Sequence, residues 1–285
     1  MQTRETIRQG AGEAKAAARG AATSRPVIWL ARLGYAVRGL VYLIIGGLAV
    51  KLAVGAGGRA TDQHGALQAI SHEPFGKFLL IIVAIGLVGY ALWKLIEALF
   101  DPDGAGRGAK GMASRVGNVV VGLAYASLAL GAISIITGSG NGGKSSNASA
   151  QDWTARLLHQ PFGVFLVVIV GLVFLAVACY LFYRAYAADF RKRLNLSSLN
   201  PQWRNWAILS GRLGYAALGV VEGIVGIFLI VAAVNKNASQ AKGLSGALLV
   251  LMHQPFGAFL LALVALGLIA YGLYSFVEAR YRRLP

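Results

Sequence analysis

The stretch RLGYAVRGLVY (residues 32–42) recurs as RVGNVVVGLAY (residues 115–125) and as RLGYAALGVVE (residues 212–222). All three copies share an arginine and two glycines in the pattern R-x-G-x4-G. A second shared stretch begins 40 to 44 residues after each arginine, and it reads HEPFGKFL (72–79), HQPFGVFL (159–166) and HQPFGAFL (253–260). Repetition at a fixed spacing indicates one structural unit used three times.

Each unit contains two apolar stretches long enough to cross a bilayer. The chain is 56% hydrophobic and only 13% charged, whereas a soluble domain averages about 25% charged residues. No charged residue occurs between Arg115 and Lys144, or between Lys242 and Glu278. About twenty helical residues span the hydrocarbon core. The sequence therefore excludes a soluble fold and predicts six helical spans, at roughly 27–54, 75–99, 114–137, 160–183, 209–234 and 255–277.

The predicted fold is an all-α membrane protein built from three parallel two-helix repeats. Because each repeat contributes two spans, all three copies enter the membrane in the same direction, and a pseudo-threefold ring of six helices is expected. The expected divisions are a tail (1–26), repeat 1 (27–100), repeat 2 (101–190), an interfacial linker (191–208) and repeat 3 (209–285).

Basic residues predict the orientation. Of the 27 Lys and Arg, 18 fall on the side of the two termini and 7 on the opposite side. Basic residues near span ends stay in the cytoplasm, so both termini are expected there. The net charge of +16 is explained by this topology and by anionic lipid headgroups, without nucleic acid. The first 26 residues lack an apolar core and predict a retained tail.

The two repeated motifs resemble those of a bacterial membrane family catalogued as domain of unknown function 1206, whose members carry three two-helix repeats. The resemblance covers about Arg32 to Arg283 and lies in the R-x-G-x4-G and PFG-x-F-L elements. It implies a protein of the bacterial plasma (inner) membrane. It implies no activity, and it assigns no functional residue.

Several local features predict packing. Gly39, Gly122 and Gly219 are each followed seven residues later by Gly46, Ala129 or Gly226, which places small residues on one helix face for close approach. A short interfacial helix is expected before each His-x-Pro, with the proline in the first turn of the following span and the Phe packed inward. Asn200 and Pro201 predict a capped helix start in the interfacial linker.

Charged groups inside the spans are the first candidates for function. Glu222 interrupts the fifth span where the other repeats carry Tyr42 and Tyr125, and a carboxylate at that depth is a functional hypothesis. Arg38 lies one turn from Tyr42 on the same face and could reach Glu222. Two interpretations stay open, a structural salt bridge or tyrosine hydrogen bond and an ion, proton or substrate site. Nearer the cytoplasm, Arg32 with Glu97 and Arg212 with Glu278 could form ion pairs.

His72, His159 and His253 are the second set of candidates. They occupy equivalent repeat positions and could converge on a metal ion, or each could brace its own helix start, which we prefer; we predict no metal. GSGNGGKS (138–145) formally matches a phosphate loop, but its context indicates a flexible linker.

No catalytic motif, cofactor site or disulfide pair is present in the sequence. We therefore expect a non-enzymatic structural or interaction subunit, in contact with anionic lipids and a membrane protein partner. The alternative is a small-molecule or ion transporter that uses Glu222 and Arg38.

Overall fold

The computed structural model describes residues 24–100, 108–139, 143–195 and 200–283, and their regular structure is helical. Six helices correspond to the six predicted spans and are long and apolar enough to cross a membrane. The all-helical membrane fold is confirmed. These helices are α2 (Arg25–Ala53), α4 (Gly76–Phe100), α5 (Ala109–Thr137), α7 (Gly163–Ala187), α8 (Pro201–Val234) and α10 (Gly257–Tyr281).

A short helix precedes the second span of each repeat, as the sequence predicts. These are α3 (Gln63–Ser71), α6 (Ser146–Leu158) and α9 (Leu244–Met252). Side chains cap two of them, because Asp62 accepts from the Gly65 amide and Ser145 from the Ala148 amide. We call this end of the bundle the short-helix end, and the end where α2 begins and α10 ends the terminus end.

The Pro-Phe-Gly motif forms a tight turn, and its Phe does not pack inward as predicted. Phe75, Phe162 and Phe256 have φ of 61°, 61° and 59° and are 84–85% exposed. Each span begins at the following glycine, so the proline lies before the helix rather than in its first turn. A Cβ on Gly76 would meet the Ile70 carbonyl oxygen at 2.5 Å. The motif therefore reverses the chain so tightly that the aromatic ring is turned outward.

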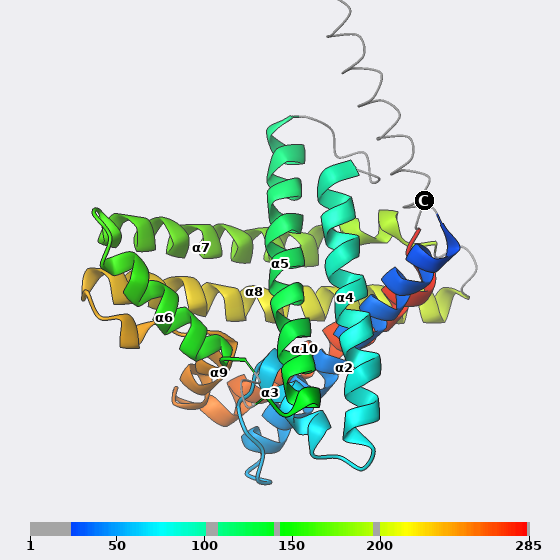
Figure 1. The fold of residues 1–285 in the computed structure, drawn as a ribbon, viewed down its shortest axis with the longest axis horizontal. Helices are drawn as coiled ribbons and strands as arrows, with labels where there is room; N and C mark the ends of the chain where they lie inside the picture. Colours follow the sequence, from blue (N-terminus) through cyan, green and yellow to red (C-terminus); the bar gives the residue numbers. More distant parts are fainter. Residues whose placement is uncertain (1–23, 101–107, 140–142, 196–199, 284–285) are drawn as a thin grey trace, which may run out of the picture.

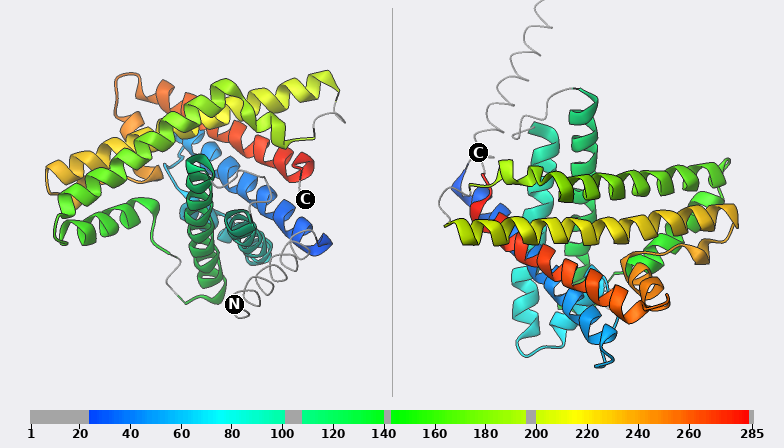
Figure 2. Two further views of the ribbon diagram at one scale, coloured as in Figure 1. Left: turned by 90° about the horizontal axis from the view of Figure 1, so that it is seen from above. Right: turned by 180° about the vertical axis from the view of Figure 1, so that it is seen from behind.

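The six long helices form three antiparallel pairs, α2 with α10, α4 with α5, and α7 with α8. Figures 1 and 2 show these pairs stacked with α2 and α10 in the middle layer, each pair crossing the next obliquely. In every pair the first helix of one repeat packs on the second helix of the preceding repeat, and repeat 1 closes on repeat 3. This cyclic order is the one expected for a pseudo-threefold ring.

The ring is open within the middle repeat. The two helices of repeat 1, α2 and α4, pack on each other, as do α8 and α10 of repeat 3. Within the described residues, α5 and α7 of repeat 2 are not among the packed helix pairs, and the views in Figure 2 place them on opposite sides of the middle layer. Repeat 2 is thus divided between two ends of the stack.

The repeated glycines lie where the pairs meet, as predicted. A Cβ on Gly39 would meet the Gly272 carbonyl oxygen of α10 at 2.8 Å, and one on Gly226 would meet the Gly171 carbonyl oxygen of α7 at 2.9 Å. Gly122 faces Leu95 of α4 in the same way. Backbones approach this closely only where no side chain intervenes.

The interfacial linker differs from its prediction. Asn200 does cap a helix, accepting from the Trp203 amide at 3.0 Å, but that helix continues without a break to Val234. A 3-10 turn, Asp189–Arg193, precedes it. The predicted tail lies outside the described residues except for 24–26.

Candidate functional site: a buried charge and tyrosine cluster

Arg38 is the centre of a buried polar cluster near the terminus end. It lies on α2 and is 5% exposed. Its Nε donates to Ser275 Oγ at 3.1 Å, its Nη1 donates to the Tyr90 hydroxyl at 2.6 Å, and its Nη2 pairs with Glu278. Because Tyr90 is on α4 and the other two partners are on α10, a single guanidinium connects three helices.

A second set of ion pairs adjoins the first. Arg282 donates to Glu278 at 3.3 Å and to Glu97 at 2.6 Å. Glu97 also accepts from the Trp93 indole and from Lys94, both at 2.6 Å. Both carboxylates are almost fully buried, and buried charges persist only when they are paired and hydrogen-bonded. Arg282 and Lys94, with the two carboxylates, therefore link α4 and α10 beside Arg38.

Tyrosine rings enclose the cations. The Arg38 guanidinium carbon lies 5.0–5.1 Å from the ring centres of Tyr35, Tyr90 and Tyr271, and Arg282 lies 5.0 Å from Tyr35. Aromatic faces attract cations, more strongly where water is excluded. Arg38 is thus fully occupied by its own protein, and this geometry supports a structural role for it.

The boundary ion pairs predicted from the sequence are wrong in their partners. Glu97 pairs with Arg282 and Lys94 in place of Arg32, and Glu278 pairs with Arg38 and Arg282 in place of Arg212. Arg212 instead donates to the Tyr186 carbonyl at 3.3 Å. The prediction paired helices of the same repeat, whereas α2 and α10 belong to different repeats and contact each other directly.

The three equivalent positions Tyr42, Tyr125 and Glu222 face the interior. Tyr42 packs edge-on against Tyr271, with ring centres 4.9 Å apart, and Tyr125 packs against Tyr90 at 4.5 Å. Within the described residues Glu222 has no hydrogen bond or ion pair. The predicted approach of Arg38 to Glu222 is wrong, because Arg38 pairs with Glu278.

Comparison with known proteins matches each repeat separately. The description "Domain of Unknown Function (DUF1206)" covers residues 33–101, 116–188 and 213–282. The chain belongs to this family. The uncharacterized protein YxxB of Bacillus subtilis (strain 168) is 37% identical over 253 residues, covering 89% of this chain and 90% of that protein. No solved structure matches. The resemblance inferred from the motifs is confirmed, and a bacterial multi-pass membrane protein is the class that these findings support.

The three repeated histidines of this DUF1206 protein do not converge. Each is the C-cap of its own short helix and is exposed. The Nδ1 of His72 donates to the Gln68 carbonyl at 2.6 Å, and that of His253 donates to the Leu249 carbonyl at 2.7 Å. Among the described residues no group of three His, Cys, Asp or Glu could hold a metal ion. Each histidine thus lies at the end of a short helix, whereas the expectation placed it as a brace for the start of the following span.

Two residues of the phosphate-loop match, Lys144 and Ser145, have structural roles. Lys144 pairs with Asp152, and Ser145 caps α6. Residues 140–142 of the match lie outside the described residues. The lysine and serine that would contact phosphate are therefore engaged in starting α6.

Two sets of hydrogen bonds at the short-helix end join different repeats and were not predicted from the sequence. Asp62 accepts from both the amide and the hydroxyl of Ser146, at 2.6 and 2.8 Å. Asn147 accepts from the Gly243 amide at 3.1 Å. These bonds join the starts of α3, α6 and α9, one from each repeat. Asp62 precedes a helix by the spacing of an N-cap, which is a signal for the cap, but nothing in the sequence indicates its second partner.

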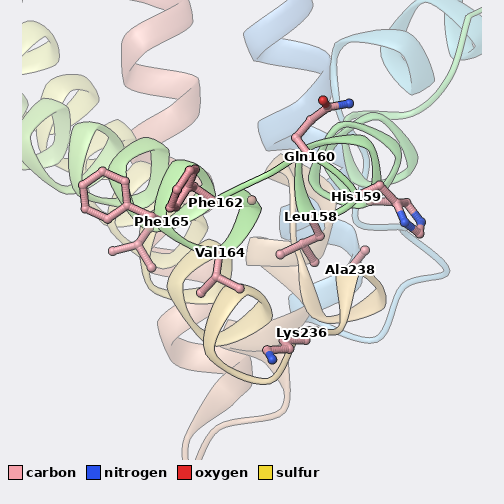
Figure 3. Close-up of a pocket in the computed structure, with 11 residues that line it drawn as sticks. Leu158, His159, Gln160, Phe162, Val164, Phe165, Lys236 and Ala238 are labelled. Carbon is pink, nitrogen blue, oxygen red and sulfur yellow. The ribbon is translucent and has the colours of Figure 1, made fainter.

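A cavity of about 760 Å³ lies at the short-helix end of α7 in this DUF1206 protein. Figure 3 shows the Phe162 and Phe165 rings on one side of it, His159 on the opposite side and Lys236 below. Most of its lining is apolar. His159 and Lys236 are the titratable residues of its lining.

Proposed function

We propose that this protein is a non-enzymatic structural or interaction subunit of the bacterial plasma membrane. The observation that carries the proposal is the divided middle repeat, in which α5 packs on α4 and α7 packs on α8 without packing on each other. Both helices leave large apolar side chains exposed, among them Leu130 at 68% and Val173 at 55%. The internally paired charge cluster supports the same function, since it rigidifies the bundle and leaves no cation free for chemistry.

The proposed partner is a transmembrane helix of another membrane protein, placed against α5 or α7. Helix association in lipid depends on close van der Waals packing. In repeats 1 and 3 the two helices of the repeat cover each other, and α5 and α7 lack this cover. We also propose contacts with anionic lipids, because the basic side chains at the terminus end attract negatively charged headgroups.

The proposed orientation places both termini in the cytoplasm. Its support is the distribution of basic residues along the sequence, 18 on the side expected to hold the termini against 7 on the opposite side. Arg191, Lys192 and Arg193 form the densest run at the terminus end outside the tail. On this orientation the cavity and the exposed Phe rings lie on the outer surface of the membrane.

Photo-crosslinking in native membranes tests the partner. A benzophenone amino acid is placed at Leu130 or Val173, and at Ile85 of α4 and Leu263 of α10 as matched positions that are 49% and 60% exposed. We expect a discrete protein adduct from the first two positions, identified by mass spectrometry, and only lipid adducts from the controls. Equal adducts at all four positions, or none beyond lipid, would contradict the proposal.

Transport is the second candidate function, favoured by one observation. Glu222 is partly buried in the middle of α8, and no described residue donates a hydrogen bond to it. In this candidate, Glu222 contacts the solute and Arg38 serves only to hold the helices. Solute flux into liposomes that falls in Glu222→Gln, with protein insertion unchanged, would favour transport over the structural function.

A further inference from the structure

Glu222 lies well inside α8, one of the six helices long and apolar enough to cross a membrane. It stands ten residues after Arg212 and twelve before Val234, where α8 ends. At 1.5 Å per residue these separations are about 15 Å and 18 Å, so both polar boundaries are remote. A carboxylate at that depth needs compensation from the protein or from a bound ion.

The surroundings of Glu222 are apolar or aromatic. On α8 its neighbours Val221 and Val225 are buried, and Gly219 and Gly226 contact α7. Glu222 is itself partly buried, and it lies three residues after Gly219 and four before Gly226, on the same side of α8 as these glycines. Its repeat 1 equivalent, Tyr42, accepts a hydrogen bond of 3.5 Å from Gln63, whereas no described residue donates one to Glu222.

The cations nearest to this region already have partners. Arg38 of α2 pairs with Glu278 of α10. Arg184 of α7 lies 4.3 Å from the ring centre of Tyr215 on α8. The other titratable groups of the interior near this level are tyrosines, among them Tyr42, Tyr125, Tyr215 and Tyr271. No described cation thus compensates Glu222, and an uncompensated carboxylate in a low-dielectric interior is strongly unfavourable.

We propose that Glu222 binds a single monovalent cation, a proton or a sodium ion, in the membrane interior. One carboxylate balances one positive charge, and the described residues offer no second acid beside it. Repeats 1 and 2 carry tyrosine at this position, so the site belongs to repeat 3 alone. The inference does not depend on whether the protein binds a partner or transports a solute.

Labelling with dicyclohexylcarbodiimide tests the site, because this apolar reagent modifies protonated carboxyl groups. The full-length protein is labelled in native membranes in choline chloride, and the modified peptides are quantified by mass spectrometry. Glu97 and Glu278 are matched internal controls, since both are buried but paired with cations. We expect Glu222 to be labelled at least about tenfold more than either, because paired carboxylates stay ionised.

A parallel sample in sodium chloride distinguishes the two cations. Suppression of Glu222 labelling by sodium assigns the site to Na⁺, and unchanged labelling assigns it to a proton. Labelling of Glu222 no greater than that of Glu97 and Glu278 would overturn the proposal. So would a melting temperature of Glu222→Gln lowered as much as that of Glu278→Gln, since a neutralised carboxyl is replaced by an amide of the same shape without loss.

Discussion

At the scale of single residues, stability depends on a few buried charged side chains. No other group can replace one of them as the partner of the charges that remain. Glu278 is 2% exposed and receives both Arg38 and Arg282. Removing one member of such a set leaves the others buried without compensation, which costs more than the intact set contributes. The surface pair Lys192–Asp189, with side chains 82% and 45% exposed, is the opposite case, because water already solvates both groups.

Glu278→Gln is therefore expected to lower the free energy of unfolding by about 3–5 kcal/mol. Asp189→Asn removes an exposed ion pair and should cost less than about 1 kcal/mol. Thermal unfolding in mild detergent, followed by circular dichroism, compares the two variants with wild type. Similar melting temperatures for both variants would mean that the buried cluster does not stabilise the fold.

At the scale of helices, the first helix of each repeat carries the contacts that order the bundle. Gly46 and Gly47 are consecutive in α2 but face different surroundings. A Cβ on Gly46 would meet Ile269 at 2.7 Å and the Ala265 carbonyl oxygen at 2.8 Å, whereas nothing lies within 4 Å of one on Gly47. The α2 and α10 backbones thus approach each other at one glycine and not at the next.

Gly46→Ala is expected to destabilise the protein by about 1–3 kcal/mol, because the backbone of α10 must move. Gly47→Ala should stabilise it by up to about 1 kcal/mol, since alanine is the better helix former. The same thermal unfolding assay resolves opposite shifts in melting temperature. A drop of equal size in both variants would indicate a general intolerance of side chains in α2.

Helix-scale features were the most predictable from sequence. Spans, short connecting helices and glycine contact faces depend on local spacing, and all were confirmed. The partner of Arg38 was not predictable, because Glu278 lies 240 positions away and only the cyclic order of repeats joins them. The outward orientation of the three motif rings was not predicted. A positive φ is rare for phenylalanine, and it turns the side chain away from the bundle at Phe75, Phe162 and Phe256.

At the scale of the whole molecule, the arrangement has the connectivity of a threefold ring and the shape of an open stack. The three contacts between successive repeats are all present, whereas in the part of the chain that the structure describes α5 and α7, the two helices of repeat 2, are not a packed pair. The polar links of Asp62 and Asn147 hold the three repeats together at the short-helix end. The proposed orientation in the membrane rests on the distribution of basic residues, and it can be tested directly.

Cysteine accessibility checks the orientation. In a Cys179→Ser background, Lys236→Cys is exposed at the short-helix end and Lys192→Cys is exposed at the terminus end. A membrane-impermeant maleimide added to intact cells should label the first variant, and label the second only after permeabilisation. The reverse pattern would place the termini outside the cell.

The packing of α2 on α10 has a consequence for the order in which the three repeats can be connected. Figure 1 shows the start of α2 beside the end of α10, and this pair repeats the contacts of α5 with α4 and of α8 with α7. Repeat 3 therefore contacts repeat 1 in the same way as each repeat contacts the next one along the chain. A circular permutant with Arg283 linked to Ser24 and new ends between Phe100 and Gly108 keeps every helix contact and should insert and melt like wild type. Failure to accumulate in membranes would show that the native starting point is required for assembly.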